Sequence, residues 1–112
     1  MTKEENFGVG TDDLGRAVFH IKINGFTLSM NIGTGGYNDN RDAPRRRRLD
    51  GVTTSSTAEC AVVYKDAVTG KTTFVTRQFF PVNDNVAGWQ NSEQIKEAIL
   101  KIIAAKSPVI SA

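Results

Sequence analysis

The sequence predicts an α+β domain: a four-stranded antiparallel sheet, built from two β-hairpins, with one C-terminal α-helix packed on one face. Three observations support this prediction. They are an Asn-Gly turn between two alternating segments, a second pair of β-branched segments, and an amphipathic stretch near the C-terminus. With 112 residues, the chain has the size of one domain. We expect a flexible N-terminal arm at 1–15, the domain at 16–107 with a long basic, Gly-rich loop at 33–56, and a tail at 108–112.

The first hairpin covers 17–32 and turns at Asn24-Gly25, because both residues tolerate the positive φ of a type I′ turn. A two-residue turn sets the register, and a slip of one residue would move every side chain to the opposite face. The apolar face then consists of the pairs Ile23–Phe26, Ile21–Leu28, Phe19–Met30 and Ala17–Ile32. The solvent-like face consists of His20, Lys22, Thr27, Ser29 and Asn31.

The second hairpin is predicted from strands at 58–65 and 72–80. The turn at 66–71 joins them, with Gly70 suited to a left-handed position. Both faces of these strands are partly apolar, which indicates either the interior of a sheet or a second face covered by a partner. Pro81 ends the second strand, and 81–91 is expected to be a loop.

The helix is predicted to begin after a cap at Asn91 or Ser92, with Gln94 in the capping-box position relative to Asn91. Ser107-Pro108 is expected to end it. Apolar side chains recur at helical spacing along one stripe, which should lie on the apolar face of the sheet. The stripe consists of Ile95, Ala98, Ile99, Ile102 and Ile103.

Positive charge is concentrated in the 33–56 loop. The chain has 14 Lys and Arg against 12 Asp and Glu, yet five of the arginines and only Asp42 fall within 41–48. The rest of the chain therefore has 9 basic and 11 acidic side chains. A connection of this length without periodicity is usually functional or disordered.

The basic loop points first to nucleic acid. Arginines that neutralise phosphates release counterions and give salt-dependent binding, and an aromatic side chain beside them can stack on an unpaired base. The nucleic-acid-binding residues we predict are Tyr37, Arg41, Arg45, Arg46, Arg47 and Arg48. A solvated loop, or a patch that meets an acidic protein partner, is the alternative reading of the same charges.

A different function follows from the second hairpin, whose apolar face would mark a protein-interaction or inhibitor module. The arginines would then steer the protein to an acidic partner. A homo-oligomer is a further alternative, since a domain of this size gains from pairing. The predicted interface residues are Val62, Tyr64, Val75, Arg77 and Trp89.

Catalysis and metal binding have little support in the sequence. His20, the one histidine, lies on a polar strand face, and Cys60, the one cysteine, lies within a strand. We therefore predict a non-catalytic protein with no cofactor and no metal site. A single cysteine, a polar N-terminus and the lack of a long apolar run predict a cytoplasmic protein that does not associate with membranes.

Overall fold

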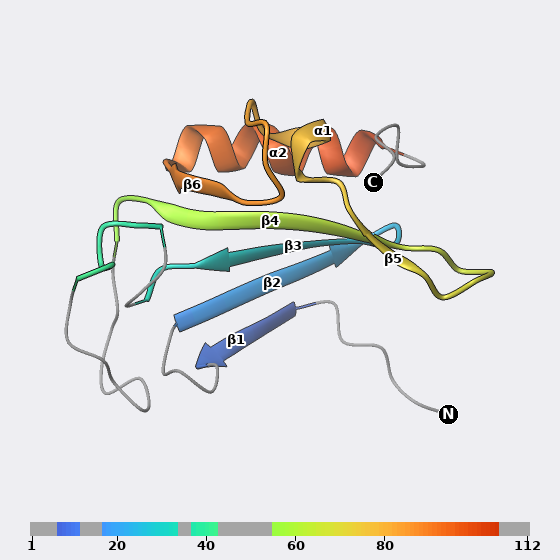
Figure 1. Ribbon diagram of the computed structural model, residues 1–112, viewed down its shortest axis with the longest axis horizontal. Coiled ribbons are helices and arrows are strands. Elements are labelled where there is room, and N and C mark those ends of the chain that lie inside the picture. Colours follow the sequence, from blue (N-terminus) through green and yellow to red (C-terminus); the bar gives the residue numbers. More distant parts are fainter. Residues whose placement is uncertain (1–6, 12–16, 34–36, 43–54, 106–112) are drawn as a thin grey trace.

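The computed structural model describes residues 7–11, 17–33, 37–42 and 55–105. It confirms the α+β class, with an antiparallel sheet and a C-terminal helix that lies along one side of the sheet (Figure 1). The strands pair in the order β1-β2-β3-β4-β5, and β6 also pairs with β4. The elements are β1 (Phe7–Thr11), β2 (Ala17–Ile23), β3 (Phe26–Asn31), β4 (Ala58–Lys65), β5 (Thr72–Phe74), α1 (Thr76–Phe79), β6 (Ala87–Gln90) and α2 (Ser92–Ala104).

The first hairpin has the predicted turn and register. Asn24 and Gly25 have φ angles of 51° and 83°, as a type I′ turn requires. The pairs Ile23–Phe26, Ile21–Leu28 and Phe19–Met30 all lie opposite one another across β2 and β3. Asn31, which the alternation places on the solvent-like face, is instead buried, and the polar contacts that cover it belong to the candidate site.

The second hairpin has the predicted turn, but its second strand is shorter than predicted. Gly70 has a φ of 73° and its amide donates to the Asp66 carbonyl oxygen, so the turn forms as expected. The strand that follows ends at Phe74, however, and the short helix α1 replaces the rest of the predicted strand at 72–80. The backbone N–H of Val75 still donates to the Val62 carbonyl oxygen at 2.8 Å, after which the chain turns away from β4.

Two short strands lie where the sequence pattern indicates none. Residues 7–11, assigned to a flexible arm, form β1 and pair antiparallel with β2. Residues 87–90, assigned to a loop, form β6 and pair with β4. Backbone hydrogen bonds to an available strand edge stabilise both, so neither needs the alternating pattern or β-propensity that a sequence reading detects. Within the described residues, the sheet therefore has six strands rather than four.

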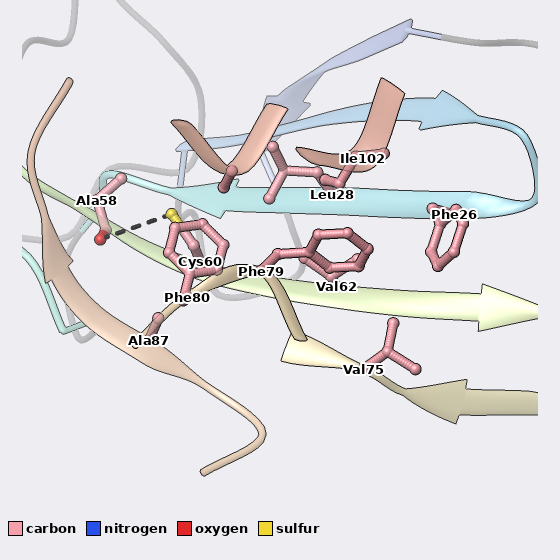
Figure 2. Close-up of a cluster of buried hydrophobic side chains, with 11 residues drawn as sticks. Phe26, Leu28, Ala58, Cys60, Val62, Val75, Phe79, Phe80, Ala87 and Ile102 are labelled. Carbon is pink, nitrogen blue, oxygen red and sulfur yellow. Dashed lines mark hydrogen bonds between the residues drawn. The ribbon is translucent and has the colours of Figure 1, made fainter. Parts of the chain in front are cut away.

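The core lies between β3 and β4 on one side and the two helices and β6 on the other (Figure 2). β4 is an interior strand whose alternate residues point into this core, which explains its apolar character. The Phe26 ring lies against Tyr64 at 4.8 Å and meets Phe79 edge-on at 5.2 Å between centroids. The buried side chains are Phe26, Leu28, Ala58, Cys60, Val62, Val75, Phe79, Phe80, Ala87, Ala98 and Ile102.

Helix α2 begins with the predicted capping box. The Asn91 side chain accepts from the Gln94 amide at 3.0 Å, and the Gln94 side chain accepts from the Asn91 amide at 2.8 Å. The helix ends at Ala104, before the expected stop at 107–108. Its stripe is buried at Ala98 and Ile102, whereas Ile103 is more than half exposed. Among the described residues, neither helix has the length and hydropathy to span a membrane.

Thr76 completes the hydrogen bonding of β4 between β5 and β6. It is buried, its hydroxyl oxygen accepts from the Val62 amide at 2.9 Å, and the same hydroxyl donates to the Asn85 carbonyl oxygen at 2.7 Å. Without it, the buried Val62 amide would lose its partner, and the carbonyl group of the exposed Asn85 would lose a hydrogen bond.

We expect Thr76→Val to reduce the free energy of unfolding by about 1–3 kcal/mol, because a shape-matched apolar side chain leaves the buried Val62 amide unsatisfied. Urea unfolding followed by circular dichroism measures the change. Thr76→Ser retains the hydroxyl and should lose much less; equal losses in the two variants would contradict this role for the hydroxyl.

Candidate nucleic-acid interface

Tyr37, Arg41 and Trp89 form a cluster on the surface, here called the aromatic cluster. The Tyr37 and Trp89 rings lie 5.5 Å apart between centroids, at 40° to each other. The Arg41 guanidinium carbon lies 4.9 Å from the centre of the Tyr37 ring, within cation–π range. Tyr37 is 44% exposed and Trp89 48% exposed, so both rings present surface to solvent.

The backbone brings these rings together. The Trp89 amide donates to the Tyr37 carbonyl oxygen at 2.7 Å, which joins the segment 37–42 to β6. Gly88 allows this approach, because a Cβ atom there would lie 2.9 Å from the Tyr37 Cβ. Trp89 itself has a φ of 48°, a left-handed conformation that is strained for a large side chain. The surrounding hydrogen bonds therefore impose the position of the indole.

Buried amides anchor the segment 37–42 beneath the cluster. Asn38 is only 1% exposed, and its Nδ2 donates to the carbonyl oxygens of Asn31 and Gly33 at 3.0 and 3.1 Å. Its Oδ1 accepts from the Asn40 amide at 2.8 Å. Asn31 is also buried, and its side-chain oxygen accepts from the Gly33 amide at 2.9 Å. This part of the 33–56 loop therefore has a defined conformation.

The same segment is joined to the chain just before β4. The Tyr37 amide donates to Glu59 Oε2 at 2.7 Å, and the Asp39 amide donates to the Thr57 hydroxyl oxygen at 3.0 Å. The Asp39 carboxylate accepts from the hydroxyls of Ser56 and Thr57, and these bonds lower the pKa of Asp39. Residues on both sides of the arginine-rich stretch are thus held together.

The structure combines two sets of predicted residues. Tyr37 and Arg41 were predicted to bind nucleic acid and Trp89 to form an interface, yet all three meet in one cluster. Trp89 follows a glycine in a segment read as a loop, and no signal in the sequence indicates its contact with Tyr37. The other residues predicted to bind nucleic acid, the arginines at 45–48, lie outside the described residues.

The other predicted interface residues are dispersed. Val62 and Val75 have no exposed surface and belong to the core, since β4 is interior and α1 folds back over it. Tyr64 is partly buried against Phe26, and Arg77 is exposed on α1. The second hairpin therefore does not present the apolar face that was expected from these residues.

Cys60 is unsuited to nucleophilic chemistry. It is buried, and burial, followed by the charge of Glu59, raises the pKa of its thiol to about 12. His20 lies opposite Ser29 on the sheet face away from the core. Among the described residues, no group of three or more His, Cys, Asp or Glu side chains is placed to hold a metal ion.

We expect Gly88→Ala to separate the two rings of the aromatic cluster, because the new methyl group would clash with Tyr37 Cβ. Trp89 is the only tryptophan, so its emission should shift to longer wavelength as the indole gains water contact. Gly70→Ala is the control: space around it is open, but its positive φ costs about 1–2 kcal/mol. It should lower stability without moving the emission; an unchanged spectrum in Gly88→Ala would contradict the contact.

Comparison of the chain with protein-family models, with curated proteins and with solved structures finds no match. The fold and the surface chemistry described above are therefore the basis on which a function is proposed.

Proposed function

We propose that this protein is a non-catalytic nucleic-acid-binding domain that contacts phosphates through the arginine-rich stretch 41–48. The observation that carries the proposal is the aromatic cluster at the start of this stretch. Arg41, the first of the five arginines, lies over an exposed tyrosine ring, and the segment that bears both is anchored to β3 and β4. Arg41 and Tyr37 therefore place positive charge and exposed aromatic surface side by side.

The chemistry of arginine favours phosphate as the ligand. The guanidinium group is planar, always charged, and binds phosphate oxygens through two parallel hydrogen bonds. Five such groups within eight residues of sequence, opposed there only by Asp42, give a local field that attracts a polyanion. An acidic protein would also be attracted, but it would gain less from exposed aromatic rings beside the charges.

The remaining chemistry is consistent with a binding protein. A thiol with a pKa of about 12 stays protonated at neutral pH and supplies no nucleophile. A free cysteine is typical of a reducing compartment, so we place the protein in the cytoplasm, where nucleic acid is accessible to it.

Salt-dependent fluorescence anisotropy with labelled oligonucleotides tests the proposal. Replacing Arg45, Arg46, Arg47 and Arg48 by Ala should reduce the slope of log affinity against log salt for a single strand by about 3, since each phosphate neutralised contributes about 0.7. Replacing the same four by Lys should preserve most of the slope. Replacing Lys96 and Lys101 by Ala removes positive charge on α2 and should leave the slope of log affinity against log salt unchanged. Absence of binding at low salt would overturn the proposal.

A protein-interaction module is the second candidate, and one observation favours it. The second hairpin exposes Phe74, at 43%, next to Val63 on the sheet face away from α2. This pair, rather than the buried Val62 and Val75, would be the apolar contact surface, with a second copy of the chain as its simplest occupant.

Light scattering tests this candidate. If the Val63–Phe74 surface joins two copies, the protein should have the mass of a dimer, and Phe74→Ser should return it to a monomer. Leu100→Ser, which changes another exposed apolar side chain on α2, is the control and should not alter the mass. A monomeric wild-type protein at high concentration would contradict the self-association.

A further inference from the structure

Among the described residues, three large aromatic side chains are more than 40% exposed, and two of them, Tyr37 and Trp89, meet in the aromatic cluster; the third, Phe74, lies in β5. Phe26, Phe79 and Phe80 are nearly inaccessible, whereas Tyr37 and Trp89 keep almost half of their surface in water. An exposed pair of large rings gives up the hydrophobic stabilisation that burial would provide. Rings that contribute little to the core, yet are held in place, are typical of a ligand-binding surface.

Holding the two rings in this arrangement also requires a strained backbone at Trp89 and a glycine at position 88. Trp89 keeps a left-handed backbone conformation, and a side chain at position 88 would collide with Tyr37. The buried Asn38 amide and the Glu59 carboxylate fix the segment that bears Tyr37. Strain and buried polar anchors are concentrated around two exposed rings, which is the pattern of a pre-organised site.

We propose that the aromatic cluster is a stacking site for an unpaired base, so that the protein selects single-stranded over double-stranded nucleic acid. This inference rests on the proposed function and adds the class of nucleic acid to it. The rings of Tyr37 and Trp89 are tilted by 40° rather than closed face to face, which leaves ring surface available for a third planar group. A base has two such faces, and stacking on aromatic side chains is a main source of single-strand affinity.

Single strands fit this site and duplexes do not. In a duplex both faces of an internal base are covered by its neighbours, so stacking on Tyr37 or Trp89 would require the base to leave the helix at a cost of a few kcal/mol. The Arg41 guanidinium lies over one face of the Tyr37 ring, 4.9 Å from its centre, so a base that stacks on the remaining exposed surface of Tyr37 or Trp89 would have a positive charge close to it. Arg41 thus connects the stacking site to the phosphate-binding arginines that follow it in the sequence.

Trp89 is the only tryptophan and reports directly on the site. We would titrate the full chain with a single-stranded oligonucleotide, the matched duplex, and inorganic polyphosphate as a polyanion without bases. The single strand should quench the Trp89 emission and bind at least roughly tenfold more tightly than the duplex. Polyphosphate should displace a labelled oligonucleotide, because it occupies the arginines, but should not quench the emission.

Tyr37→Leu provides the matched variant, since it removes the ring and retains an apolar side chain. It should weaken single-strand binding roughly tenfold and leave duplex and polyphosphate binding unchanged. Tyr37→Phe retains the ring and should bind as the wild type does, which also shows that the segment folds. Phe74→Leu removes an aromatic side chain of similar exposure in β5 and should have no effect on any of the three ligands.

Different results would overturn phosphate binding by the arginines and base stacking on the aromatic cluster. Base stacking would be overturned if single strand and duplex bound with equal affinity and Tyr37→Leu did not change that affinity. If binding still depended on the arginines, phosphate binding would remain in place. Equal losses for the single strand and polyphosphate in Tyr37→Leu would assign Tyr37 a purely structural role and also overturn the stacking site. Failure of all three ligands to bind at low salt would remove the proposed function and the inference together.

Discussion

The structure depends on the pairing of both edges of β4, an interior strand of the sheet. One edge pairs along its length with β3, which the Asn24-Gly25 hairpin holds in register. The other edge pairs with β5 near its end and with β6 near its start, and Thr76 supplies the side-chain hydroxyl between them. An interior strand must satisfy every backbone N–H and C=O group, so this requirement places β5, α1 and β6 together. The core then forms where these elements meet α2.

The aromatic cluster is a consequence of the same strand. β6 pairs with the first residues of β4 through Ala87 and Gln90, which lie on either side of Trp89, and the Trp89 amide bonds to the Tyr37 carbonyl oxygen. Glu59, in β4 itself, and Thr57, just before it, bind the backbone of the segment that carries Tyr37 and Arg41. The surface rings are therefore supported by an interior strand of the sheet. Such support allows a strained and exposed arrangement to persist, because local rearrangement would have to break hydrogen bonds of the sheet or its immediate anchors.

The two parts of the proposed interface do different physical work. In this proposal the arginine-rich stretch would attract a polyanion over a distance, and its contribution would weaken with salt and would not depend on base identity or strand number. The aromatic cluster acts only at contact and depends on an accessible base face, so it is little affected by salt. Arg41 belongs to both parts, so one ligand that contacts it would gain both the long-range and the short-range contributions. The buried Cys60 and the core around it contribute to stability rather than to this interface.

Local patterns in the sequence determined the α+β class, the first hairpin with its register and the capped start of α2, and they indicated that β4 is either interior or covered by a partner on its second face. Each depends on residues close together in the chain, such as Asn24 with Gly25 or Asn91 with Gln94. The sequence also located the basic stretch and identified Tyr37 and Arg41 as candidates. Tertiary structure alone decided the rest: the end of β5 at Phe74, the strands β1 and β6, the burial of Asn31 and Asn38, and the contact between Tyr37 and Trp89. These features depend on hydrogen bonds of backbone groups with segments that are distant in the sequence. Because every residue has the same backbone groups, such bonds produce no pattern in the order of side chains.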